Sequence, residues 1–88
     1  MKEKSVIIKL DDGIHARPAA ILVQKASSYP NTTIKIRRDN VEIDAKSIMS
    51  IMMLALTYGS EITIIAEGLE EEIAVEEISN LIENNFQV

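Results

Sequence analysis

The sequence predicts an α+β fold: an open two-layer sandwich in which a four-stranded antiparallel sheet carries three helices on one face. Segments of period two and segments of helical period follow one another in the order β-α-β-β-α-β-α. Each predicted strand has one apolar face, so the sheet needs a cover on one side only. The length of 88 residues fits one small domain, and we expect residues 1–88 to form it.

The predicted strands cover residues 5–10, 32–37, 41–43 and 62–66. In the first of them, Val6, Ile8 and Leu10 share one face, and Ile7 and Lys9 share the other. The turn residues of Arg38–Asn40 separate the second strand from the third, which predicts a hairpin.

The predicted helices cover residues 16–28, 47–57 and 69–83. In the first and third of them, the apolar residues recur at the spacing of one helix face. The expected buried stripes are Ala19, Leu22, Val23 and Ala26 in the first helix and Ala74, Ile78, Leu81 and Ile82 in the third. Glu70, Glu71 and Glu72 fall in the expected first turn of the third helix, where negative charge suits the helix dipole.

Composition argues against several classes of function. Nine basic against 14 acidic residues give a net charge of −5, which argues against a direct nucleic-acid binder. One histidine and no cysteine argue against disulfides, thiolate metal sites and a structural zinc site of the usual kind, and we expect no metal site. The sequence shows neither a secretory signal nor a membrane span, so we expect a cytoplasmic protein without membrane insertion.

The histidine lies in the segment Gly13–Ala20, G-I-H-A-R-P-A-A, at the start of a predicted helix. The N–H groups and dipole of a helix N-terminus attract anions, and Arg17 adds a guanidinium that bonds phosphate oxygens. These residues suit a phosphorylated imidazole, in which a ring nitrogen of His15 attacks a phosphoryl group. The alternative is that His15 is only a helix cap or a surface residue.

The segment Ile48–Leu56 reads I-M-S-I-M-M-L-A-L and is apolar except at Ser50. A helix that is apolar all round needs burial all round, for which a small open-faced domain has no room. We therefore expect part of this helix to form an exposed, methionine-rich docking patch. The candidates are Ile48, Met49, Met52 and Met53. The alternative is a core helix whose methionines fill gaps.

Ser47 precedes this segment and is predicted to be its N-cap. The functional alternative is a regulatory phosphorylation site, because a phosphate at that position would suit the helix dipole. It would also place a charge of about −2 beside the apolar patch.

Together these motifs resemble the histidine-containing phosphocarrier (HPr) family of the phosphoenolpyruvate–sugar phosphotransferase system. The resemblance covers nearly the whole chain, including the element order. It rests on G-I-H-A-R-P-A-A at Gly13–Ala20, K-S-I-M at Lys46–Met49 and E-I-T-I-I-A-E-G at Glu61–Gly68. It implies a phosphoryl carrier that is a substrate of other enzymes rather than an enzyme, and that needs no cofactor.

The resemblance also implies roles for single residues. His15 would take phosphate on Nδ1 from phosphorylated enzyme I and pass it to enzyme IIA domains, while Arg17 and the amides of Ala16 and Arg17 hold the phosphate. Ser47 matches a serine that HPr kinase/phosphorylase phosphorylates in Gram-positive members. The resemblance implies that the protein phosphorylated there binds a catabolite control repressor. The implied docking residues are Ala20, Ile48, Met49 and Met52.

Two departures from the family pattern stand out. Asp12 precedes Gly13 where Ser, Thr or Asn is common, so a carboxylate either points away from the phosphate or makes the phosphohistidine transfer more readily. Ser50 replaces a common glycine after S-I-M, and the second helix ends in L-A-L rather than L-G. The second departure concerns the fit to partners that recognise Ser47.

Two other functions remain open at this stage. A regulatory module could act mainly through phosphorylated Ser47 as a corepressor, although the resemblance implies that such variants lack the active histidine. A small-ligand sensor domain would require an apolar pocket with converging polar groups, which nothing in the sequence indicates. For all three functions we expect a monomer.

Overall fold

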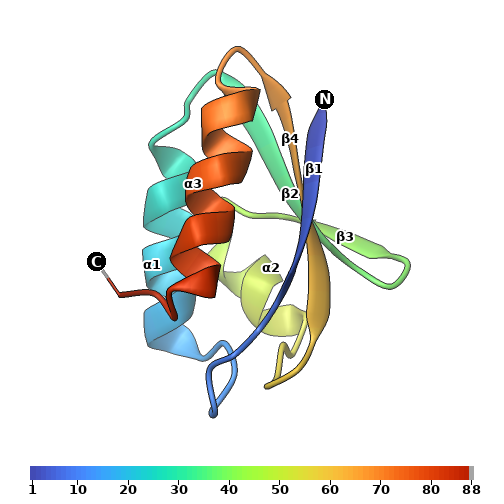
Figure 1. Ribbon diagram of the computed structural model, residues 1–88, viewed down its shortest axis with the longest axis vertical. Helices are drawn as coiled ribbons and strands as arrows, with labels where there is room; N and C mark the ends of the chain where they lie inside the picture. Colours follow the sequence, from blue (N-terminus) through green and yellow to red (C-terminus); the bar gives the residue numbers. More distant parts are fainter. Residues whose placement is uncertain (88) are drawn as a thin grey trace.

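The computed structural model describes residues 1–87 and confirms the predicted fold class and element order. The strands are β1 (Lys2–Ile7), β2 (Thr32–Arg38), β3 (Val41–Asp44) and β4 (Glu61–Gly68), and the helices are α1 (Ala16–Ser27), α2 (Ile48–Met53) and α3 (Glu71–Glu83). Figure 1 shows α1 and α3 side by side on one face of the sheet, with α2 next to the first half of α1.

The sheet has the strand order β1-β4-β2-β3, and all neighbouring strands are antiparallel. Val6 lies opposite Ile62, and Ile34 lies opposite Ala66. Because side chains alternate along a strand, these pairs point to the same face. All four residues are buried, so this face forms the core with the helices.

The predicted apolar faces are confirmed with small exceptions. Val6, Ile8, Ile34, Ile36 and Ile62 are buried, and so are Ala19, Leu22, Ala26, Ala74, Ile78, Leu81 and Ile82. Leu10 and Val23 are only partly buried and pack against the edge of the core. Alternation and helical spacing therefore identified the buried side of each element.

The predicted first strand, residues 5–10, is wrong in its bounds. It begins at Lys2, because Lys2 and Lys4 pair with Ala66 and Ile64 of β4 even though both side chains are charged. The predicted start of the third helix at Leu69 is also wrong. Glu70 is its N-cap, and a Glu70 carboxylate oxygen accepts hydrogen bonds from the Asn31 N–H and the Thr32 hydroxyl.

The second helix is shorter than the predicted span of residues 47–57. It ends at Met53 with Leu54 as C-cap, and Ala55 has a left-handed backbone with φ of +52°. A helix cannot continue through that conformation, although the apolar run of the sequence continues through Leu54 and Leu56. Both are buried, so the chain leaves α2 without leaving the core.

A polar cluster joins the end of α1 to α3. The Tyr29 hydroxyl donates to Glu77 Oε1, and Lys25 Nζ lies 2.9 Å from the same oxygen. These two donors hold the pKa of Glu77 below its ordinary value. Burial, followed by the bond to Glu77, raises the pKa of Tyr29.

We expect Ala55→Gly to stabilise the protein by about 1 kcal/mol, because glycine adopts a positive φ without the steric cost that alanine bears. Urea unfolding of both proteins measures the difference. An equal or lower stability of the variant would show that Ala55 carries no strain. Ala20→Gly, at an exposed position inside α1, is the matched control and should destabilise by roughly 0.5–1 kcal/mol.

The cluster around Glu77 predicts a loss of stability in acid. Because the folded-state pKa of Glu77 lies below its unfolded value, its contribution is complete above about pH 5 and falls as the pH drops below that. Glu77→Gln should therefore flatten the dependence of the unfolding free energy on pH between about 5 and 3. Glu72→Gln, at an exposed site on the same helix, is the control, and equal slopes in the two variants would contradict the prediction.

Candidate functional site

The loop before α1 turns at Gly13, and its path depends on that residue. The Gly13 N–H donates to Leu10 O at 2.9 Å, and φ of Gly13 is +70°. A Cβ at this position would lie 2.4 Å from Leu56 O, so only glycine fits against the α2–β4 loop. The next residue, Ile14, is buried and donates its N–H to Leu56 O at 2.9 Å.

His15 follows this anchor and is the N-cap of α1. Its carbonyl oxygen accepts the Ala19 N–H at 3.0 Å, whereas its exposed imidazole makes no hydrogen bond to the amides of α1, which is described in full. The backbone of His15 therefore caps the helix, as one alternative proposed, but its side chain does not. Solvent reaches the ring at the positive end of α1.

The first turn of α1 offers the two amides that the sequence singled out. The N–H groups of Ala16 and Arg17 have no partner inside a helix that begins at Ala16, and Pro18 has no N–H at all. Arg17 is exposed and lines an open cavity of about 580 Å³ together with His15. The other lining residues are Leu10, Pro18, Ile21, Asn85, Phe86 and Gln87.

The wall at Asn85–Gln87 was missed by the sequence analysis. Phe86 is buried and donates its N–H to Leu81 O at 2.8 Å, which folds the chain end back towards α1. Asn85 and Phe86 both have left-handed backbones, with φ of 56° and 61°. The chain's only phenylalanine, just beyond an amphipathic helix, was the one signal in the sequence that could have suggested this anchor.

The expected docking patch lies on the surface. In the α2 patch, which we define by the side chains of Ile48, Met49, Met52 and Met53, the exposed fractions are 42%, 76%, 40% and 81%. Ile51 is fully buried on the opposite side of the helix. The alternative of a wholly buried helix is therefore wrong. Ala20, the docking residue expected on α1, is also exposed.

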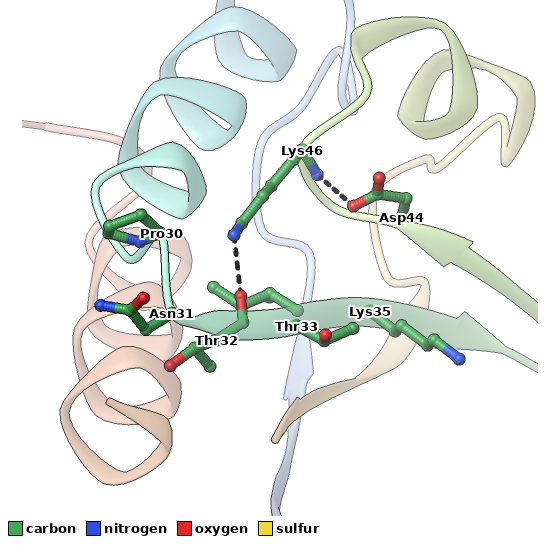
Figure 2. A pocket seen from close by; sticks show the side chains of 8 residues that line it. Pro30, Asn31, Thr32, Thr33, Lys35, Asp44 and Lys46 are labelled. Carbon is green, nitrogen blue, oxygen red and sulfur yellow. Dashed lines mark hydrogen bonds between the residues drawn. The ribbon is translucent and has the colours of Figure 1, made fainter. Parts of the chain in front are cut away.

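Ser47 is the N-cap of α2, as predicted, and its Oγ accepts the Ser50 N–H at 3.2 Å. The preceding Lys46 extends its ammonium to Tyr29 O at 2.8 Å and Thr32 O at 2.7 Å. Figure 2 shows this side chain reaching from the β3–α2 turn to the start of β2. These bonds fix the turn that positions Ser47, which is half-buried.

The structure brings some of the candidate residues together and separates others. His15 and Arg17 share one cavity, and the bond from Ile14 to Leu56 joins their loop to the chain that leaves α2. Figure 1 shows the start of α1 and α2 at the same end of the molecule. Ser47 precedes α2 and does not line the His15 cavity. Asp12 is exposed in the turn before Gly13.

Within residues 1–87, no helix has the length and hydropathy needed to cross a membrane. The same part of the chain has no group of three or more histidine or carboxylate side chains placed to hold a metal ion.

Comparison with known proteins agrees with this geometry. Residues 2–84 match the family model described as "PTS HPr component phosphorylation site". The chain is 46% identical to the HPr-like protein Crh of Halalkalibacterium halodurans, over 94% of this chain and 98% of that protein. It is 40% identical to phosphocarrier protein HPr of Treponema pallidum, over 99% and 98% of the two chains.

Solved structures give the same fold. The crystal structure of HPr from Thermoanaerobacter tengcongensis superposes with a TM-score of 0.93 and 44% identity, covering 98% of this chain and 96% of that one. A second structure from that organism, described as an HPr dimer, matches all of both chains with a TM-score of 0.78 and 43% identity. The family model, the curated relatives and the solved structures agree, and the chain belongs to the HPr family of phosphocarrier proteins.

Proposed function

We propose that this chain is a phosphoryl carrier of the sugar phosphotransferase system. In this function, His15 takes the phosphoryl group from phosphorylated enzyme I and passes it to enzyme IIA domains. The observation that supports it best is the exposed imidazole of His15, which shares one cavity with Arg17 at the N-terminus of α1. We further propose that the chain works in the cytoplasm as a monomer.

The chemistry is a reversible transfer between nucleophiles. Nδ1 of His15 attacks phosphorus and forms a P–N bond, while the bond from phosphorus to the donor breaks and its electron pair stays with the donor. The Arg17 guanidinium and the amides of Ala16 and Arg17 supply donors for the phosphoryl oxygens. Members of this family are carriers and not enzymes, so the partner proteins supply the rest of the catalytic groups.

The α2 patch supplies the second requirement of a carrier, which is orientation. Flexible methionines adapt to partners of different shape, and this chain must dock on a donor and on acceptors. Burial of the patch against a partner places His15 at the edge of the contact, because α2 packs on α1. Docking thereby converts an encounter between two proteins into a positioned transfer.

A second function rests on a specific observation, the similarity to a Crh protein at 46% identity and to an HPr at 40%. A regulatory module would act through Ser47 phosphorylated by an HPr kinase/phosphorylase and would bind a catabolite control repressor. His15 and Arg17 favour the carrier, because the regulatory function needs neither of them. Ser47 permits both functions, and we propose it as a regulatory phosphorylation site of the carrier.

Phosphorylation by enzyme I and phosphoenolpyruvate tests the carrier directly. We expect a mass increase of one phosphoryl group that is acid-labile, because a P–N bond hydrolyses in acid, and that is absent from His15→Ala. The exposed imidazole makes no contact with the helix amides, so that variant should fold normally by circular dichroism.

The same preparation separates the two functions. Only acid-stable phosphate, formed with ATP and the kinase and lost in Ser47→Ala, would contradict the carrier and support the regulator. Unfolding of His15→Ala would instead show that the histidine is structural.

The α2 patch predicts the effect of Met49→Glu. A charge in an apolar contact should raise the KM of enzyme I for this carrier by roughly tenfold. The free energy of unfolding should change by less than about 0.5 kcal/mol, because Met49 is exposed. Leu69→Glu is the matched control, at an exposed apolar residue outside α2, and should leave KM unchanged. A loss of stability above about 3 kcal/mol would place Met49 in the core.

A further inference from the structure

The end of α2 is stabilised by a side chain from another element. Arg38, the last residue of β2, donates from Nη1 to Leu54 O at 2.8 Å and to Ala55 O at 3.0 Å. Arg38 is half-buried and follows the alternation of Ile34 and Ile36, so its side chain lies on the helix-covered face of the sheet. A guanidinium at the negative end of a helix satisfies carbonyls that the helix leaves without partners.

This contact holds a strained segment at the end of α2. Helix α2, which the structure describes in full, has no basic residue in its last turn. Ala55 bears the steric cost of a left-handed backbone, since its φ is +52°. The two hydrogen bonds from Arg38 offset this cost and fix the direction in which the chain leaves α2.

The fixed segment is the support of the His15 loop. Leu56, one residue beyond Ala55, accepts the Ile14 N–H at 2.9 Å, and its carbonyl packs against Gly13. A shift of Leu56 O therefore displaces Ile14, and His15 is the next residue along the chain. The path runs from Arg38 through Leu54–Leu56 to the loop that ends at the helix N-cap.

We propose that Arg38 is a positioning residue for His15, acting through the carbonyls at the end of α2. It does not line the His15 cavity, so its effect on His15 is indirect. Its role is to keep the imidazole at the start of α1 in a fixed position relative to the α2 patch. The consequence for phosphoryl transfer rests on the proposed carrier function, whereas the structural coupling does not.

Hydrogen exchange at the Ile14 amide tests the coupling. In Arg38→Gln we expect the protection of this amide to fall by about tenfold, while protection of the central-strand amide of Ile64 changes less than about twofold. The matched control is Arg37→Gln, the same change one residue earlier. Arg37 lies near Glu3 and Glu42 and not near α2, so the control should keep the Ile14 protection.

Two further variants identify the mechanism. Ala55→Gly in the Arg38→Gln background should restore Ile14 protection, because glycine removes the strain that Arg38 offsets. Arg38→Lys should retain protection, because an ammonium can donate to two carbonyls, as Lys46 does elsewhere in this chain. Arg38→Lys also keeps the proposal testable if Arg38→Gln does not fold, since a loss of Ile14 protection in the lysine variant would contradict it.

The kinetics of phosphoryl transfer to His15 test the functional consequence of losing Arg38. With phosphoenolpyruvate, Arg38→Gln should lower the kcat of enzyme I for this carrier by about tenfold and change its KM by less than about twofold. The α2 patch still docks in this variant, whereas the imidazole is no longer fixed in position. Equal Ile14 protection in Arg38→Gln and Arg37→Gln, or a loss spread evenly to Ile64, would overturn the proposal. If the unmodified chain accepts no phosphate, the carrier function fails, and the exchange results still decide the role of Arg38.

Discussion

The approach of Gly13 to the carbonyl of Leu56 is the constraint on which the site depends. The chain passes from β1 into α1 through residues 8–15, and it turns at Gly13 against another loop with no space for a side chain. Ile14 then inserts into the core and bonds the same carbonyl. These contacts determine that α1 begins at Ala16 and that His15 is its N-cap. An imidazole one residue further along would lie in the first turn of α1 instead of at its N-cap.

The shortness of α2 has an equally direct consequence. A helix of six residues makes fewer than two turns, so it buries one side and exposes the rest. Ile51 supplies the buried side, and the methionines form the surface. The left-handed Ala55 ends the helix and returns the chain to the core at Leu56, where it meets the His15 loop. The α2 patch and the histidine are therefore joined by the hydrogen bond from Ile14 to Leu56 as well as by the packing of α1 on α2.

Much of the fold could be predicted from local sequence patterns. The features of the site that could not be predicted depend on contacts between residues distant in the sequence. Alternation in β1 and β2 and helical spacing in α1 and α3 identified the buried faces, because each pattern repeats over several residues. The end of α2 could not be predicted, since the apolar run continues through Leu54 and Leu56, which are buried after the helix stops. The donor that stabilises this end, Arg38, is 16 residues from Leu54, so no local pattern reports it. Likewise, the wall that Asn85–Gln87 add to the His15 cavity could not be predicted, because it forms only when the chain end folds back towards α1.

In the proposed carrier function, the phosphoryl group must be bound weakly enough to be released again. The first turn of α1 fits that requirement. An anion-binding helix usually offers several amides, but Pro18 removes one of them. Arg17 is exposed, so water weakens its charge interaction with a phosphate compared with a buried pair. The cavity around His15 is open, and in the proposed carrier function a docked partner completes the enclosure. In that proposed function, strong electrostatic stabilisation arises only in the complex, where transfer occurs, and not in the free phosphorylated protein, where it would oppose release.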